Sequence, residues 1–173
     1  MAGRGIGAAG FLSLLALLAS QPASALPTQT FQVSAAIVAG CVISGTNTGV
    51  FGVLNFGTRS GVETANIGAS YVQSSSINIA CTPGTPLSMS INGGGNYTTT
   101  RNLKLDSFSN TLAYRLFTNA SYSAASEIPV NQNVALSYSN ANNITLPIYG
   151  LVQLRGAQRA GSYSDTLIVT LSW

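Results

Sequence analysis

The sequence contains no histidine, and its ionisable side chains are few, with seven Lys and Arg residues and four Asp and Glu residues among 173. General acid–base catalysis requires positioned titratable groups, and these four acids are scattered along the chain. No nucleophile elbow precedes a helical pattern, and the glycine-rich stretch GGGNY (93–97) lacks both the Lys and the helix of a phosphate loop. The sequence therefore predicts no enzyme, no cofactor and no metal site.

Charged residues are also few, and the positive ones are too sparse to indicate a polyanionic partner. The formal net charge is +3, and the cations are scattered, which argues against nucleic-acid binding despite the basic isoelectric point. Most of the remaining residues are Ser, Thr, Asn, Gly and small apolar residues. A neutral polar surface of this kind provides little electrostatic repulsion between molecules, and it suits a protein that associates with others.

Cysteine is scarce, with only Cys41 and Cys81 present. In an exported chain an even number of cysteines favours a disulfide, and two cysteines allow only one pairing. The alternative is a redox or metal-binding pair, which the missing CxxC spacing and the absent histidine disfavour. We therefore expect a structural disulfide between these two residues.

Long apolar runs are limited to the beginning of the chain. Arg4 is followed by an apolar run over residues 8–19 and then by the small-x-small pattern of residues 23–25. This order is typical of a cleaved secretory signal, which we place at residues 1–25, and the run is too short for the alternative of a membrane anchor. We expect the exported chain to begin at Leu26.

Short segments of alternating apolar and polar residues make up the rest of the chain, and Gly, Asn, Pro and Ser separate them. No sustained helical periodicity is present after the signal, so the pattern indicates one all-β domain, a sandwich or a barrel. Pro147 lies inside one of these segments and predicts an edge position or a bulge there. The predicted strand segments are 42–45, 50–57, 72–81, 86–93, 111–119, 134–139, 144–154 and 163–173.

The stretch TFQVSAAIVAGC (30–41) precedes this domain and also alternates, but no tight turn follows that would fold it into a hairpin. The chain also ends in an alternating segment, which runs to Trp173. Exposed strand edges aggregate unless they are covered. The two terminal strands therefore pair either within the molecule or with another molecule.

Three motifs carry a resemblance to a known family: FGVLNFG shortly after the first cysteine, LPIYG late in the chain, and the ending GSYSDTLIVTLSW. From about Thr30 to Trp173 the chain resembles the spore coat protein U domain family, and in particular the subunits of archaic, Csu-type chaperone–usher pili. The resemblance implies an incomplete immunoglobulin-like β-sandwich over residues 41–173, completed by a donor strand from a neighbouring subunit or a chaperone. It also implies that residues 26–40 form an extension that carries this donor strand.

The resemblance assigns roles to particular residues. It implies that the donor strand enters a neighbouring groove through alternating side chains, namely Phe31, Val33, Ala35 and Ile37. It implies that the edge of the groove and the chaperone contact lie on the last strand, at Leu167, Val169, Leu171 and Trp173. The cysteines match the disulfide positions of the family, whereas Ala35 is smaller and Trp173 larger than the family pattern expects.

The implied protein is a structural fimbrial subunit that is exported to the periplasm and assembled on the cell surface, where the fibre supports attachment and biofilm formation. Its implied partners are identical or related pilus subunits, a periplasmic chaperone and an outer-membrane usher. One alternative is a spore or cyst coat protein of the same family. Another is a monomeric, secreted carbohydrate-binding β-sandwich that uses exposed aromatic residues, for which the candidates are Tyr97, Tyr114, Tyr122, Tyr138 and Tyr149.

Overall fold

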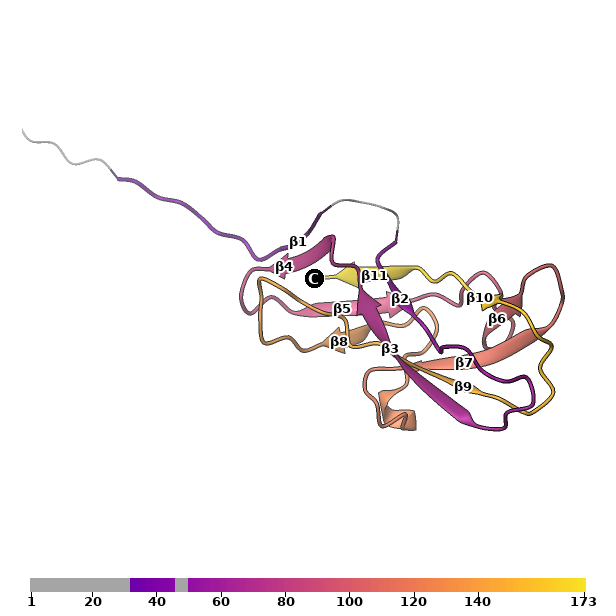
Figure 1. The fold of residues 1–173 in the computed structure, drawn as a ribbon. Coiled ribbons are helices and arrows are strands. Elements are labelled where there is room, and N and C mark those ends of the chain that lie inside the picture. Colours follow the sequence, from indigo (N-terminus) through magenta and orange to yellow (C-terminus); the bar gives the residue numbers. More distant parts are fainter. Residues whose placement is uncertain (1–31, 46–49) are drawn as a thin grey trace, which may run out of the picture. The chain divides into compact units, whose positions relative to one another are not determined.

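A computed structural model of the chain describes residues 32–45 and 50–173. The predicted signal at residues 1–25, and Phe31 of the predicted donor strand, lie outside the described residues. The described part is all-β with one short 3₁₀ helix, η1 at Ala124–Ser126 (Figure 1). The strands are β1 Cys41–Gly45, β2 Gly52–Leu54, β3 Asn66–Gln73, β4 Ile77–Cys81, β5 Leu87–Ile91, β6 Arg101–Leu105, β7 Thr111–Phe117, β8 Val134–Leu136, β9 Tyr149–Gln153, β10 Tyr163–Ser164 and β11 Val169–Ser172.

The strands form three antiparallel sheets. The largest has six strands in the order β10-β6-β7-β9-β3-β2, the second has three in the order β11-β5-β8, and β1 pairs with β4 in the third. Strands β2 and β11 therefore lie at the ends of the two larger sheets. Within residues 32–45 and 50–173, no helix has the length and apolar character needed to cross a membrane.

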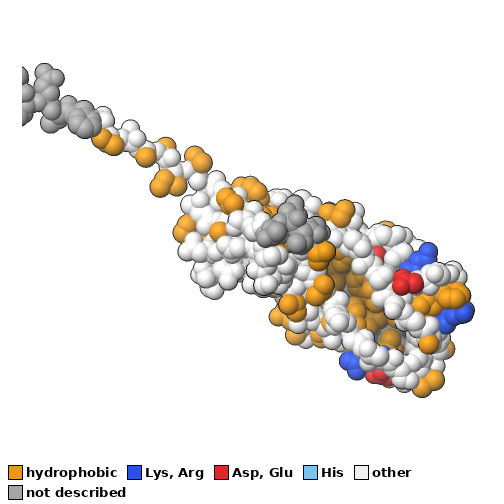
Figure 2. Space-filling view, turned by 45° about the horizontal axis from the view of Figure 1, so that its top comes forward, with side chains coloured by type: hydrophobic (Ala, Val, Ile, Leu, Met, Phe, Trp, Pro, Cys, Tyr) orange, Lys and Arg blue, Asp and Glu red, His pale blue; other side chains and the backbone are white. Residues whose placement is uncertain are grey.

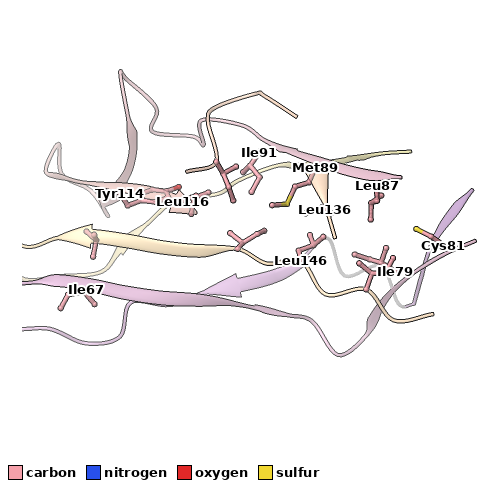
Figure 3. Packing of buried hydrophobic residues seen from close by; sticks show 14 of the residues in the cluster. Ile67, Ile79, Cys81, Leu87, Met89, Ile91, Tyr114, Leu116, Leu136 and Leu146 are labelled. Carbon is pink, nitrogen blue, oxygen red and sulfur yellow. The ribbon is translucent and has the colours of Figure 1, made fainter. Parts of the chain in front are cut away.

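The core lies between the six-stranded and the three-stranded sheet (Figure 3). Alternation along β5 places Leu87, Met89 and Ile91 inside, each at most 3% exposed, while the serines between them are only partly buried. Leu116 and Val152 enter the same core from β7 and β9 of the facing sheet. This face-to-face packing of two alternating sheets is the expected consequence of the period-2 pattern.

The predicted final strand, 163–173, is divided into two strands in the structure. Its start, β10, pairs with β6 in the six-stranded sheet, whereas its end, β11, pairs with β5 in the three-stranded sheet. Residues 165–168 cross from one sheet to the other. Alternation continues through a crossing of this kind because residues on both sides of it face the same core, so periodicity alone does not mark the break.

Two further differences from the predicted pattern have local causes. The alternation of segment 111–119 places Phe117 on the face opposite Leu116, where an exposed side chain is expected, but Phe117 is fully buried because the Tyr122 ring packs edge-on against it at 5.5 Å. Pro147 was predicted at an edge or a bulge, and it instead precedes β9, a central strand between β7 and β3. A proline just outside a strand removes no ladder hydrogen bond.

Candidate functional site

An apolar groove of about 550 Å³ opens between β2 and the segment that leads into β11. Its walls are residues 50–54 on one side and 165–169 on the other. Figure 2 shows apolar side chains gathered in a hollow of the domain surface. The floor consists of Ile148, which precedes β9, and of side chains from both sheets, namely Ile91, Leu103, Tyr114 and Leu116.

Strand β2 forms most of one wall of this groove, and the other wall leads into β11, whose first residue, Val169, lines the groove. Among the described residues, β2 pairs only with β3, and β11 pairs only with β5. Each strand therefore presents backbone N–H and C=O groups that have no neighbouring strand on the groove side. Such an edge is a template for pairing with another strand, and here two of them border one apolar floor.

The four residues expected on the groove edge occupy different positions in the structure. Leu167 and Val169 line the groove, and Leu171 packs against the core beyond it. Trp173 is 58% exposed, and its indole nitrogen lies 4.0 Å from the point where a Cβ on Gly40 would be. The end of the last strand is therefore next to the base of the extension.

Asp165 organises one end of the groove. Its Oδ2 accepts a hydrogen bond from the Tyr114 hydroxyl at 2.8 Å, and its Oδ1 accepts hydrogen bonds from the Gly95 N–H at 2.9 Å and from the Asn96 amide at 3.2 Å. A Cβ on Gly94 would lie 2.0 Å from the carboxylate, and the positive φ of 86° at this residue also favours glycine. The GGGNY stretch (93–97) thus packs closely around this carboxylate and donates hydrogen bonds to it.

Two tyrosines of the groove have perturbed acidity. Burial raises the pKa of Tyr71 to about 12, and its hydroxyl donates to the Phe51 carbonyl at 2.8 Å. Burial, together with the hydrogen bond to Asp165, raises the pKa of Tyr114 far above its usual range. Both hydroxyls therefore keep their protons to a higher pH than a free tyrosine does, and both donate hydrogen bonds beside the groove.

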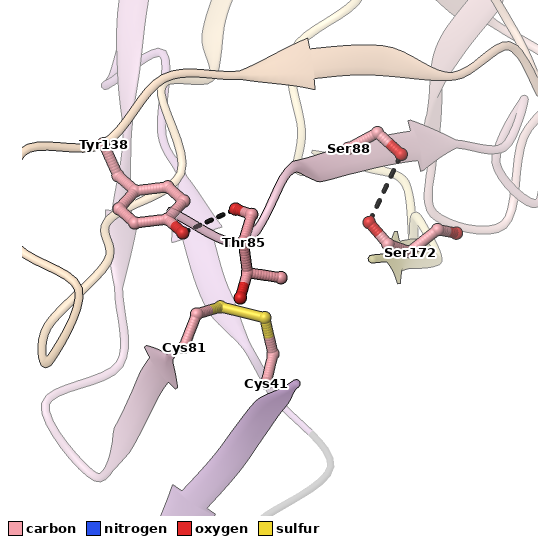
Figure 4. Close-up of a disulfide and its surroundings, with 6 residues drawn as sticks. All are labelled: Cys41, Cys81, Thr85, Ser88, Tyr138 and Ser172. Atoms are coloured by element: carbon pink, nitrogen blue, oxygen red, sulfur yellow. Dashed lines mark hydrogen bonds between the residues drawn. A yellow bond between two sulfur atoms is a disulfide. The ribbon is translucent and has the colours of Figure 1, made fainter. Parts of the chain in front are cut away.

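A disulfide joins Cys41 at the start of β1 to Cys81 at the end of β4 (Figure 4). The two residues are also partners in the β1–β4 register, and the Gly40 carbonyl accepts a hydrogen bond from the Thr82 N–H at 2.8 Å. The disulfide therefore fixes the chain at the point where the extension meets the domain.

The part of the extension that the structure describes, residues 32–40, contains no strand. Its candidate donor residues Val33, Ala35 and Ile37 are all exposed, with Ile37 at 89%. Val38, which the alternation places on the opposite face, is 81% exposed as well. Apolar side chains with this exposure are available to a partner.

The five candidate tyrosines of the carbohydrate-binding alternative are not gathered on one face. Tyr114 is a floor residue of the groove, and Tyr138 donates to the Thr85 carbonyl beside the disulfide. Tyr122 and Tyr149 line a common hollow, which lies on the outer face of β2 and β3. Sequence reasoning did not identify this hollow, because nothing in the pattern places residue 122 over strand β3.

The described residues thus form an all-β domain whose sheets leave an apolar groove between two unpaired edges. The sequence model of the Spore Coat Protein U domain matches residues 27–170, and the chain belongs to this family. No curated protein has a sequence that matches this chain significantly.

Two solved structures show a distant likeness. One is the complex of the CsuC chaperone with the CsuE tip adhesion subunit, from the archaic chaperone–usher Csu pili of Acinetobacter baumannii, with a TM-score of 0.45 and 18% identity over 79% of this chain and 40% of that chain. The other is a chaperone–tip adhesin complex of CFA/I fimbriae biogenesis. It has a TM-score of 0.37 and 15% identity, over 76% of this chain and 41% of that chain. This chain thus spans about two fifths of each matched chain.

Proposed function

We propose that this protein is a structural subunit of a chaperone–usher fibre, which accepts a strand in its groove and donates residues 30–39 to a neighbour. The observation that carries the proposal is the apolar groove between the unpaired edges of β2 and β11. A strand placed there would bond to backbone groups and cover the apolar floor. This is β-strand addition, in which main-chain bonds supply affinity and side-chain pockets supply specificity.

The extension has the composition that such a groove requires. Its alternation places Phe31, Val33, Ala35 and Ile37 on one face, and no charged residue occurs between Leu26 and Thr58. Burying one large apolar side chain is worth roughly 1.5–3 kcal/mol, so the three large residues support a long-lived joint. Ala35 contributes less because its side chain is small.

The donating and accepting surfaces are different parts of one chain, so the contact between two copies is heterologous. A head-to-tail contact that does not close on itself produces an open filament. The fibre would support surface attachment and biofilm formation. Family membership, the predicted signal and the disulfide all support export and assembly outside the cytoplasm.

An unfilled groove exposes apolar surface, so an unassembled subunit requires a partner that covers it. A periplasmic chaperone that lends its own strand would serve this need. An outer-membrane usher would then bring two subunits together, so that the extension of the second replaces the strand of the chaperone. Without the chaperone, we expect the exported subunit to aggregate or to be degraded.

The test compares two charge substitutions in the extension, Ile37→Arg and Val38→Arg. Both residues are exposed, so neither substitution disturbs the domain core. Arg at position 37 would bring a charge into the apolar groove, at a high desolvation cost, whereas position 38 lies on the opposite face of the strand. Unboiled denaturing gels of surface-sheared material should show SDS-resistant multimers for the native chain and for Val38→Arg, but not for Ile37→Arg.

The other outcomes of this gel lead to different conclusions. Normal multimers with Ile37→Arg would contradict the donor assignment. A single monomer band in every lane would favour a monomeric carbohydrate-binding module, for which the hollow lined by Tyr122 and Tyr149 is the candidate site. Multimers found in the envelope of a spore or cyst, rather than in sheared surface material, would favour a coat protein of the same family.

A further inference from the structure

An apolar groove with no strand in it should collapse, because water-exposed apolar surface is removed whenever walls and floor come together. The wall at residues 165–168 lies outside the β-ladders of the domain. It belongs to no strand, and the ladder between β11 and β5 begins only at Val169. Something other than a sheet must therefore hold this wall in place.

Two anchors hold this wall to the loop at residues 92–96. At one end, Ile168 donates to the Asn92 side chain at 2.9 Å and accepts a hydrogen bond from the Asn92 N–H at 3.1 Å. At the other end, the Asp165 carboxylate receives the Gly95 N–H and the Asn96 amide. The wall is thus tied at both ends to the loop that follows β5.

The same carboxylate also reaches across to the opposite sheet. Tyr114 belongs to β7 of the six-stranded sheet, and its ring is part of the groove floor. Its hydroxyl donates to Asp165 Oδ2, so this hydrogen bond sets the separation between the wall and the floor. The Phe56 ring packs against the Tyr114 ring at 6.4 Å, which fixes the position of the tyrosine.

We propose that Asp165 is a positioning residue that holds the groove open before a strand enters, through Tyr114 and the loop at residues 92–96. The role rests on the proposed function, since an open groove matters only if a strand is captured. Preorganisation of this kind strengthens binding because the site does not have to be opened at the moment of association.

The test isolates strand acceptance from strand donation. A full-length exported chain carrying Ile37→Arg is the parent, because it cannot donate its own strand but retains the groove. The probe is a fluorescent synthetic peptide with the sequence of residues 30–40. The parent and its variants are diluted from denaturant into the peptide, and fluorescence anisotropy follows the rate of capture and the dissociation constant.

Two tyrosine-to-phenylalanine substitutions in this parent are matched to each other. Tyr114→Phe removes the hydroxyl that reaches Asp165, and Tyr138→Phe removes a hydroxyl that donates to the Thr85 carbonyl at 2.6 Å, near the disulfide and outside the groove. We expect Tyr114→Phe to capture the peptide about tenfold more slowly than the parent. Tyr138→Phe should change capture by less than about twofold, even if both variants melt at a similarly lowered temperature.

Substitutions of Asp165 provide a graded series. Asp165→Asn retains one carbonyl oxygen for the Gly95 N–H, whereas Asp165→Ala removes every acceptor, so capture should fall from the parent through Asn to Ala. Equal capture by Tyr114→Phe and Tyr138→Phe would overturn the role of Asp165 while leaving the proposed function intact. A parent that captures no peptide would overturn the proposed function, and the role of Asp165 with it.

Discussion

Arg101 is the most deeply buried charged residue among those described, with 4% of its surface exposed. Its guanidinium donates only to backbone carbonyls, at 2.8 Å to Ile128 and at 2.9 Å to Ile91 and Asn92. Burial lowers the pKa of this arginine, and no carboxylate lies within hydrogen-bonding distance of it. The guanidinium therefore links β6, through several hydrogen bonds, to the end of β5 and to the segment before β8.

Replacing Arg101 with Met should lower the free energy of unfolding by about 2–4 kcal/mol, because buried carbonyl groups lose their donors. Arg115 is the matched control, since it pairs with Glu127 on the surface and its side chain is 51% exposed. Arg115→Met should cost less than about 1 kcal/mol. Urea unfolding of both chains measures the difference, and equal losses would contradict the role assigned to Arg101.

The raised pKa of Tyr71 predicts a loss of stability at alkaline pH. The folded state holds the phenolic proton up to about pH 12, whereas the unfolded chain releases it near its ordinary value of 10.0. Above that lower value the unfolded state binds fewer protons than the native state, so stability falls as the pH rises. Tyr71 should contribute at most about 1.4 kcal/mol of this loss between pH 9 and pH 11, and Tyr114, whose pKa burial also raises, should add a loss in the same direction.

Tyr71→Phe separates this effect from general alkaline unfolding. The variant loses the hydrogen bond to Phe51, so it should be less stable than the native chain at pH 8. Its stability should nevertheless fall less steeply between pH 9 and pH 11. Thermal unfolding across this pH range measures both slopes, and parallel slopes would show that Tyr71 does not titrate as described.

At the scale of elements, alternation predicted those strands whose inward residues are large. Leu87, Met89 and Ile91 of β5 follow the pattern strictly, and all three are buried. β3 was predicted only at its end because Gly, Ala and Ser dilute the contrast between its faces, although Ile67 and Tyr71 do point inward. β6 was missed entirely because a buried Arg and a buried Asn interrupt its apolar period.

For the candidate groove, the sequence-based assignment covered only the last strand. Leu167 and Val169 line the groove, while the assignment of the last strand as groove edge and chaperone contact stays a prediction. The opposite wall on β2 and the floor residues were not predicted, because periodicity identifies a buried face but not which strand lies beside it. Asp165 was not predicted as a groove residue, because its contact with Tyr114 depends on the segment that crosses between the sheets.

The disulfide constrains strand β1, which has few buried side chains to hold it against the domain. β1 is mostly exposed, and among the described strands it pairs only with β4, so Cys41 and Cys81 supply a covalent link at its first residue. The two cysteines are 40 positions apart, and closing a loop of that size is worth about 4 kcal/mol in the chain-entropy model. Cys41→Ser should therefore lower the abundance of the protein in the cell and its resistance to protease.

The double substitution of Cys41 and Cys81 by Ser provides the control for this prediction. If the loss comes from the missing link, the double variant should match the single variant in abundance and in protease resistance. A single variant that is much worse than the double variant would instead implicate the unpaired thiol that it leaves behind. Unchanged abundance in both would show that the disulfide contributes little to the stability of the domain.

At the scale of the whole molecule, the proposed joint between copies is almost free of charge. Residues 26–58 contain no charged side chain, and among the residues that the structure describes Asp165 is the only charged one that lines the groove. Its carboxylate is already engaged by three donors from its own domain. Apolar contact and backbone hydrogen bonds would therefore hold one copy to the next, with little contribution from ion pairs.

A fibre joined in this way should resist salt. Electrostatic interactions between exposed charges are strongly screened when the ionic strength rises from about 0.01 M to about 1 M, whereas apolar burial is not weakened by screening. The multimer ladder on unboiled gels should therefore be unchanged after incubation of sheared fibres at either ionic strength, and boiling should still collapse it. A ladder that shortens at high salt would mean that charged surfaces outside the groove carry the joint, and that the inserted strand alone does not hold the copies together.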